Sequence, residues 1–147
     1  MSIETRAINL TLPYPPSVNA YWRVWDGRIL LSKRGREYRK RAEACVLMAG
    51  CPSIGKARAH VDIRAYPPDR RVRDLDNIRK AVNDALEACG VVENDSQIKR
   101  DSGEMFDPDK ANPRIEITIE PDPRHAALDE LVAEGQARGE YGTETQP

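Results

Sequence analysis

The chain is organised around residues 73–90, which read RDLDNIRKAVNDALEACG. From Ile78 to Cys89 the apolar residues recur at intervals of three and four, the pattern of an amphipathic helix with one buried face. Asp76 occupies the position expected of an N-cap, and Gly90 that of the left-handed residue after a helix end. If Asp74 and Asp76 lie on extended backbone, their side chains leave one face roughly 7 Å apart. That spacing suits a shared cation.

A third carboxylate follows this predicted helix, in the turn-like run of residues 93–96. We expect the returning chain to bring Asp95 beside Asp74 and Asp76. Oxygen ligands without nearby histidine are typical of Mg²⁺, with Mn²⁺ as a substitute. Lys80 follows Asp76 by four residues and therefore shares its helix face. A cation there can bind a phosphate or stabilise the charge that develops on one.

Basic residues surround this acidic centre, as a site needs if it must hold a metal and also receive a polyanion. They are Arg70, Arg71, Arg73, Arg79 and Lys80. The pattern alone has a second interpretation, in which Asp76 only caps the helix, Asp74 is a solvated acid and Asp95 is a turn residue. Asp84, four residues after Lys80, is interpreted as a surface or pairing residue outside the site.

Charge is unevenly distributed along the 147 residues, whose net charge is −1. Residues 120–147 carry a net charge of −5, which leaves +4 for residues 1–119. Residues 21–41 hold eight bases and two acids. These bases form either a solvated helix face or a surface that follows DNA phosphates, which supply most sequence-independent affinity. We find no run long enough to span a membrane and no signal peptide, which predicts a cytoplasmic protein without a membrane partner.

Alternation with a period of two predicts strands at residues 8–12, 60–66 and 115–119. A short strand is predicted at 28–31, and residues 97–105 are predicted to be extended. Ser32 is the predicted N-cap of a first helix that reaches Ala49. The alternation of predicted strands and helices along the chain predicts an α/β or α+β domain over residues 1–120, with a small mixed sheet and two main helices. Helical crossovers predict a parallel pairing somewhere in the sheet. Residues 121–147 are predicted to be an acidic tail that forms a short helix or is disordered.

The proline-rich segment after the first strand is predicted to be a loop. Its aromatic residues have two interpretations, because they either pad the edge of a small core or offer a surface on which bases stack. They are Tyr14, Tyr21, Trp22 and Trp25. In the second interpretation Arg23 meets a phosphate.

Two motifs resemble the RusA family of Holliday-junction resolvases. The first is PPDRRVRDLDN at residues 67–77, followed by KA at 80–81, DAL at 84–86 and DSQI at 95–98. The second is LPYPPSVNAYWR at residues 12–23. Both occur in the family's order, and with the flanking strands the resemblance covers about residues 8–120. It does not cover the C-terminal tail.

The resemblance implies a Mg²⁺-dependent crossover junction endodeoxyribonuclease that resolves four-way DNA junctions by paired symmetric nicks in recombination and repair. It implies that Asp74, Asp76 and Asp95 ligate the metal and that Lys80 stabilises charge on the phosphate. It also implies a homodimer, and a phage or prophage setting is common for such short resolvases. Together with the charge pattern, it predicts DNA contacts from Arg23, Lys33, Arg34, Arg36, Arg70, Arg71, Arg73 and Lys80.

The sequence departs from the family pattern at two positions. Many relatives carry two adjacent acids where this chain has Asn94 and Asp95, so an auxiliary carboxylate is missing. Val72 interrupts an arginine run that is often unbroken. Two other functions stay open. One is a junction-binding protein with impaired catalysis, which metal-dependent nicking would exclude. The other is a metal-dependent phosphoryl-transfer enzyme on small nucleotides, against which a steep salt dependence of DNA binding would count.

Overall fold

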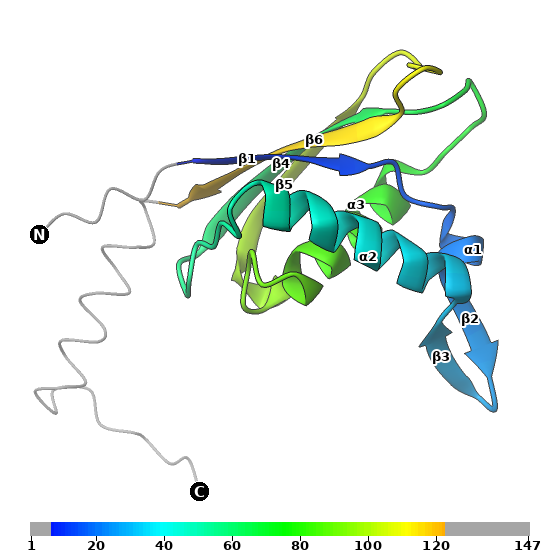
Figure 1. Cartoon of the computed structure of the whole chain (residues 1–147), viewed down its shortest axis with the longest axis horizontal. Helices are drawn as coiled ribbons and strands as arrows, with labels where there is room; N and C mark the ends of the chain where they lie inside the picture. Colours follow the sequence, from blue (N-terminus) through cyan, green and yellow to red (C-terminus); the bar gives the residue numbers. More distant parts are fainter. Residues whose placement is uncertain (1–6, 123–147) are drawn as a thin grey trace, which may run out of the picture.

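The structure, a computed structural model, describes residues 7–122. Four strands form one mixed sheet in the order β1-β6-β4-β5, in which only β4 and β5 pair in parallel. They are β1 (Ile8–Pro13), β4 (Ala59–Tyr66), β5 (Ile98–Met105) and β6 (Arg114–Pro121). Two long helices, α2 (Lys33–Met48) and α3 (Leu75–Ala88), cover one face of this sheet (Figure 1). The predicted α+β fold with a mixed sheet and two main helices is therefore confirmed.

The core lies between this sheet and the helices. Alternate residues of β4 and β6 are fully buried, with Val61 opposite Ile119 and Ile63 opposite Ile117. The apolar face of α3 packs against them through Ile78, Ala81, Val82, Ala85 and Leu86. Each buried Val, Leu or Ile side chain contributes about 1.5–3 kcal/mol relative to its exposed state. The apolar residues at every second position of the strands thus pack against those at every third or fourth position of the helix, in one core layer.

The ends of α3 confirm one expectation and correct another. Gly90 follows the helix with φ +76°, as predicted for the residue after a helix end. The N-cap, however, is Asp74, whose Oδ1 accepts from the Asp76 N–H at 2.9 Å. The predicted N-cap Asp76 lies in the first turn, because Leu75 packs against the core and begins the helix. Asp74 and Asp76 are therefore not both on extended backbone.

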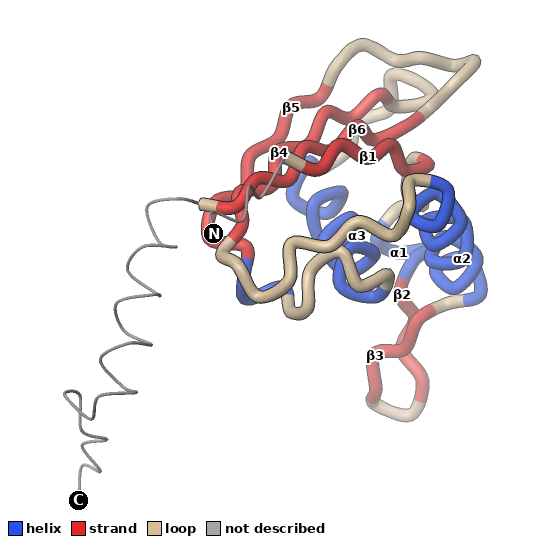
Figure 2. The backbone as a smooth tube through the Cα atoms, turned by 60° about the vertical axis from the view of Figure 1, so that its left-hand side comes forward, coloured by secondary structure: helices blue, strands red, loops and turns tan. Residues whose placement is uncertain are grey.

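Part of the predicted loop after β1 is regular structure. A single helical turn, α1 (Val18–Tyr21), leads into a hairpin of β2 (Trp22–Trp25) and β3 (Arg28–Leu31). Its two-residue turn is Asp26-Gly27, both with positive φ, as a type I′ turn requires. The Asp-Gly pair between two apolar runs was the sequence signal for this hairpin. It projects away from the sheet and helices (Figure 2).

The base of this hairpin is joined tightly to α2. Ser32 is the predicted N-cap, and its hydroxyl accepts from the Gly35 N–H at 3.0 Å. The same hydroxyl donates to the Ala20 carbonyl, while the Ser32 N–H donates to the Tyr21 carbonyl at 3.0 Å. A Cβ atom on Gly35 would overlap that Tyr21 oxygen. Glycine is therefore required where α2 crosses the chain that enters the hairpin.

One polar cluster ties the helices together. Arg39 of α2 donates twice to the carboxylate of Asp84 on α3, at 2.8 and 2.6 Å, and the Tyr21 hydroxyl donates to the same carboxylate. Burial, and then the hydrogen bond to Asp84, raise the pKa of Tyr21 above its ordinary value. Asp84 is thus a pairing residue, as predicted. Tyr21 is fully buried, so the base-stacking interpretation is wrong for this aromatic.

No helix within residues 7–122 is both long enough and apolar enough to cross a bilayer. Only Pro121 and Asp122 of the predicted acidic tail are described: Pro121 ends β6, and the Asp122 N–H donates to the Arg58 carbonyl at 2.8 Å. The rest of the predicted tail lies outside the described residues.

We predict that Gly35→Ala destabilises the protein, although alanine is the better helix former. At an open helix position this change would stabilise by about 1 kcal/mol. Here the added methyl overlaps the Tyr21 carbonyl oxygen, and overpacking of this kind costs about 1–3 kcal/mol. Urea denaturation followed by tryptophan fluorescence measures the difference in the free energy of unfolding.

Ala44→Gly is the matched control, because Ala44 is exposed on the same helix. This substitution should lower the free energy of unfolding by about 1 kcal/mol through the lower helix propensity of glycine alone. A Gly35→Ala protein more stable than wild type would show that α2 can move away from the hairpin base.

Candidate active site

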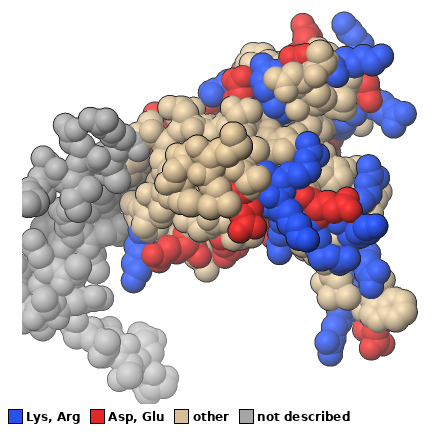
Figure 3. Space-filling model, in the orientation of Figure 1, with Lys and Arg blue, Asp and Glu red and all other residues tan. Residues whose placement is uncertain are grey.

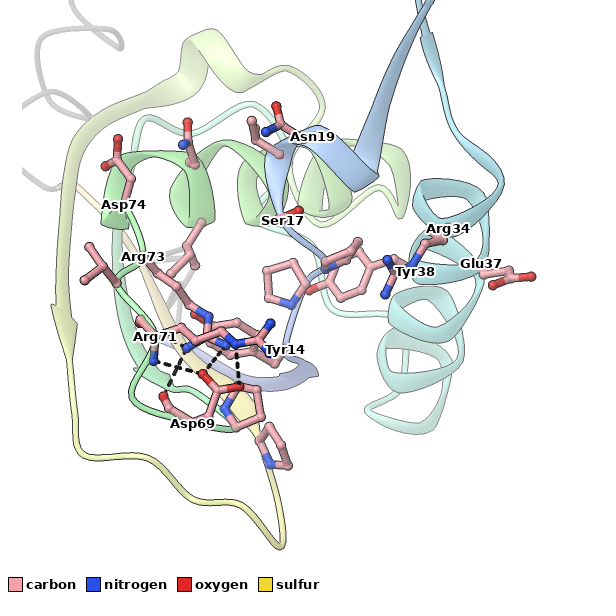
Figure 4. Close-up of a pocket in the computed structure, with 18 of the residues that line it drawn as sticks. Tyr14, Ser17, Asn19, Arg34, Glu37, Tyr38, Asp69, Arg71, Arg73 and Asp74 are labelled. Carbon is pink, nitrogen blue, oxygen red and sulfur yellow. Dashed lines mark hydrogen bonds and ion pairs between the residues drawn. The ribbon is translucent and has the colours of Figure 1, made fainter.

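A cavity of about 880 Å³ opens where the two motif segments meet (Figure 4). Residues 14–19 line one side, and the loop before α3 lines another with Asp69, Arg71 and Arg73. The N-cap Asp74 stands at its edge. Helix α2 completes the wall with Arg34, Glu37, Tyr38 and Arg41. Segments about 50 residues apart in sequence therefore share one concave surface, as an active site requires.

Both signs of charge meet in this cavity. Arg34, Arg41, Arg71 and Arg73 line it together with Glu37, Asp69 and Asp74. Lys and Arg side chains gather at the end of the molecule that carries α1, the hairpin and the start of α2 (Figure 3). Four of the predicted site residues line this cavity: Arg34, Arg71, Arg73 and Asp74.

The two motif aspartates both lie at the start of α3, Asp74 as its N-cap and Asp76 in its first turn. Asp74 is exposed and is oriented by the hydrogen bond that it accepts from the Asp76 N–H. The Asp76 side chain is 77% exposed and pairs with Arg79 at 3.0 Å. Exposed ion pairs contribute little free energy, so a divalent cation can displace the guanidinium at low cost. Lys80 is exposed one turn beyond Asp76, on the same helix face as predicted.

Asp95 lies far from these two carboxylates, contrary to the expectation. It begins the short 3-10 helix η1 (Asp95–Gln97), directly before β5. Ile98 of β5 pairs with Ala59 at the beginning of β4, whereas Asp74 follows the end of β4. Helix α3 has 14 residues and therefore spans about 21 Å between the two sites. Within residues 7–122 no group of three acids, histidines or cysteines is placed to hold a metal ion.

The turn that carries Asp95 is nevertheless held firmly. The Asn94 side chain accepts from the Ser96 N–H at 2.8 Å, and Gln97 Oε1 accepts from the Asn94 N–H at 2.8 Å, which completes a capping box. The Gln97 amide also donates to the carbonyls of Gly55 and Ala57, at 2.7 and 2.9 Å. Asn94, the residue that departs from the family pattern, thus has a capping role. Asp95 itself is exposed on this turn.

Arg73 holds the loop between β4 and α3. Its guanidinium pairs with the Asp69 carboxylate at 2.7 Å, donates to the Asp69 carbonyl at 3.0 Å and lies 5.5 Å from the ring centre of Tyr14. The Arg71 N–H and the Arg73 guanidinium hold the pKa of the Asp69 carboxyl below its ordinary value. Arg73 therefore shapes the cavity, whereas the Arg71 side chain is 85% exposed and available to a ligand.

The other predicted DNA contacts fall in three places. Arg70 is exposed beside Arg71 in the loop. Lys33, Arg34 and Arg36 are exposed on the first turn of α2, where Arg36 also donates to the Leu31 carbonyl at 3.0 Å. Arg23 is exposed on the hairpin, outside the cavity.

The predicted site residues did not include Arg41, Asn19 or Asn77, which line the cavity. Arg41 belongs to the basic run of residues 21–41, for which a surface that follows DNA phosphates was one interpretation. Arg41 lies on the same face of α2 as Arg34, two helical turns further along, which is a spacing the sequence contains. Asn19 and Asn77 belong to the two quoted motifs but were given no role. Each carries both a donor and an acceptor that can orient a phosphate or a base.

Comparisons with known proteins agree with this geometry. Residues 13–120 match the family model described as endodeoxyribonuclease RusA. The crossover junction endodeoxyribonuclease rusA of Enterobacteria phage HK97 is 40% identical over 86 residues, which are 58% of this chain and 72% of the relative. The proteins of the same name from Enterobacteria phage 82 and Escherichia coli (strain K12) are each 38% identical over 112 residues, which are 76% of this chain and 92% of the relative.

The family model covers well over half of the chain and contains nearly all of both motif segments, whose residues line the cavity. The relatives from phage 82 and Escherichia coli are covered over nearly their whole length. This chain belongs to the RusA family of endodeoxyribonucleases.

Proposed function

We propose that this chain resolves four-way DNA junctions by paired, Mg²⁺-dependent nicks and acts as a homodimer. The observation that carries the proposal is the cavity that joins both motif segments, with carboxylates at the start of α3 and arginines around them. The relatives are named crossover junction endodeoxyribonucleases, which supports a branched DNA substrate. We assign the activity to a domain of residues 1–120 and treat residues 121–147 as an acidic tail outside it.

The donor set at the start of α3 fits a hard divalent cation. Asp74 and Asp76 are exposed carboxylates, and neither histidine nor cysteine lines the cavity. Mg²⁺ is usually held by one or two carboxylates together with waters and substrate phosphates, and Mn²⁺ shares this preference. When bound, such an ion polarises the phosphate and lowers the pKa of a coordinated water.

The residues of the chain would position the phosphodiester. The N-terminus of α3 carries a partial positive charge that favours a phosphate beside the two carboxylates. Lys80, one turn further along, adds a full positive charge where negative charge grows during hydrolysis. Arg34, Arg41 and Arg71 line the cavity and would bind neighbouring phosphates of the same strand. Arg73 would act indirectly, because it keeps the loop in place.

Asp95 would complete the site from a second copy of the chain. Asp95 follows the other end of α3 from Asp74 and is exposed on a rigid turn, which supports a role in the site of another copy. In a two-fold dimer, one surface of each copy contacts the equivalent surface of the other. Antiparallel α3 helices in such a dimer would bring the Asp95 turn of each copy to the Asp74 end of the other. Cutting would then require the dimer, and each dimer would have two sites for the two strands.

We predict that mixed dimers restore activity to two inactive variants. Asp74→Asn and Asp95→Asn homodimers should each lose Mg²⁺-dependent nicking while they still bind the junction. In a heterodimer of the two, one site has Asp74 and Asp76 from the Asp95→Asn chain and Asp95 from the other. Random pairing should therefore recover about a quarter of the wild-type sites. Nicking of a labelled synthetic junction by co-expressed, differently tagged chains measures this.

A mixture of Asp74→Asn and Asp76→Asn chains is the matched control. Every site in that heterodimer has a defective carboxylate, so no activity should return. Failure of the first mixture to recover, with an active wild type, would contradict a site shared between chains. A wild type that binds the junction tightly but never nicks it would support the catalytically impaired binder instead.

We predict a steep loss of junction affinity with rising salt. Each phosphate contact neutralised by a basic side chain contributes about 0.9 to the slope of log affinity against log salt. Arg34→Ala and Arg41→Ala should each reduce that slope by about 1. Fluorescence anisotropy of a labelled junction at several KCl concentrations measures it.

Arg64→Gln is the control for this series, because Arg64 lies on the sheet face away from the helices and pairs with Asp62 and Glu116. Its slope should equal that of wild type. A slope near zero, together with metal-dependent hydrolysis of small nucleotides, would favour the phosphoryl-transfer alternative.

A further inference from the structure

The β2–β3 hairpin, residues 22–31, exposes apolar side chains that the active site does not use. We call this hairpin the arm. Val24 is 75% exposed, Ile29 is 74% exposed and Trp25 is 65% exposed. Large apolar groups gathered on a projecting element, rather than scattered singly, mark a contact surface. None of these three residues lines the cavity.

The register divides the arm into two different faces. Val24 pairs with Ile29 on the same face as Trp22 and Leu31, which pack against the core. This face is apolar from the root to the tip. The other face pairs Arg23 with Leu30 and Trp25 with Arg28, and the Arg23 guanidinium lies 5.7 Å from the Trp25 ring centre. One face is thus an apolar ridge, and the other combines an aromatic ring with two cations.

Charge indicates what the arm meets. Between residues 21 and 36 the sequence has five bases and a single acid, Asp26 at the tip. These bases are Arg23, Arg28, Lys33, Arg34 and Arg36. The equivalent region of a second copy carries the same excess of positive charge, so two arms would repel each other. A nucleic acid offers the complementary combination, a polyanionic backbone with flat apolar bases inside.

The arm is also rigid at its root and adjacent to the cavity. Ser32 and Gly35 lock the start of α2 against the carbonyls of Ala20 and Tyr21. Val18 and Asn19 precede the arm, Arg34 follows it, and all three line the cavity. Strands of four residues extend about 13 Å. DNA held in the cavity therefore passes within reach of the tip.

We infer that the arm is a wedge that inserts Val24 and Ile29 at the branch point of a four-way junction and stacks Trp25 on an unpaired base there. This inference rests on the proposed junction resolvase function. Bases at a branch point are already partly unstacked, so an apolar wedge can separate them more easily than bases within a duplex. Arg23 and Arg28 bind the phosphates that flank the opened step. Branch recognition thereby resides in the arm, and phosphodiester hydrolysis resides in the cavity.

The test uses 2-aminopurine placed beside the branch point of a synthetic junction, with the full chain and a chelator to prevent cutting. Wild type should raise the fluorescence of this base several-fold, whereas 2-aminopurine in the middle of a junction arm should not respond. Val24→Thr combined with Ile29→Thr keeps β-branched residues that suit a strand but makes the ridge polar. This variant should abolish most of the rise and weaken junction binding about 10-fold, with duplex binding changed less than about 2-fold.

Leu47→Thr combined with Met48→Gln is the matched control, because both residues are exposed at the other end of α2. It should behave as wild type.

A second readout follows Trp25 directly. Trp22→Phe leaves Trp25 as the one remaining tryptophan, and its emission should be quenched by junction DNA more strongly than by duplex.

Different failures have different meanings. If wild type cuts junctions but the polar-ridge variant still raises the 2-aminopurine signal fully, the wedge is excluded. If sedimentation shows that this variant is a monomer and wild type a dimer, the arm is an interface between copies and the inference is overturned. If wild type neither binds nor cuts junctions, the proposed function itself fails.

Discussion

Ala59 pairs with Ile98 in a parallel register, so the chain must return from the end of β4 to its beginning before β5 can start. Helix α3 makes that return and buries its apolar face against β4 and β6 on the way. The two ends of the helix consequently lie at opposite ends of the sheet. This one constraint places Asp74 and Asp76 at the start of α3 and Asp95 beyond its other end, with a helix about 21 Å long between them. This separation of the carboxylates within one chain is what the proposed sharing of metal ligands between two copies rests on.

A second set of interactions brings the N-terminal motif to the carboxylates. Tyr21, Arg39 and Asp84 connect α1, α2 and α3 through one carboxylate. Because the Tyr21 hydroxyl and ring are buried, the chain before and after it has little freedom. Residues 14–19 therefore face the loop that Arg73 stabilises, with the cavity between them. The polar cluster outside the site determines the shape of the site.

The proposed site residues, apart from the helix cap Asp74, contribute little to stability. Asp74, Asp76, Lys80 and Asp95 are all exposed, and the Asp76–Arg79 pair is a surface pair. The core beneath them is a regular layer of Val, Ile, Leu and Ala side chains. This separation explains how the surface can keep clustered charges and an apolar arm, which the proposed contact with DNA would use. Gly35 serves both packing and the arm. Its lack of a side chain lets α2 contact the Tyr21 carbonyl, and this contact sets the direction in which the arm leaves the domain.

The sequence by itself determined the elements whose signals are local. The buried face of α3, the Ser32 cap, Gly90 and the strands at residues 8–12, 60–66 and 115–119 follow from periodicity and backbone preference. The Asp26-Gly27 turn was equally local, but the proline-rich context led to the prediction of a loop. The helix start also differed by two residues, because Leu75 finds a core contact that no local rule contains.

Only the tertiary structure decided how these elements face one another. With about 20 residues between them, Asp74 and Asp95 could lie at the same end of the sheet or at opposite ends. The parallel pairing of β4 with β5 places them at opposite ends. The buried position of Tyr21 and the exposed position of Trp25, four residues apart, likewise depend on which side of the chain meets α2 and α3. These arrangements depend on contacts between segments distant in the sequence, so they cannot be predicted from any one segment alone.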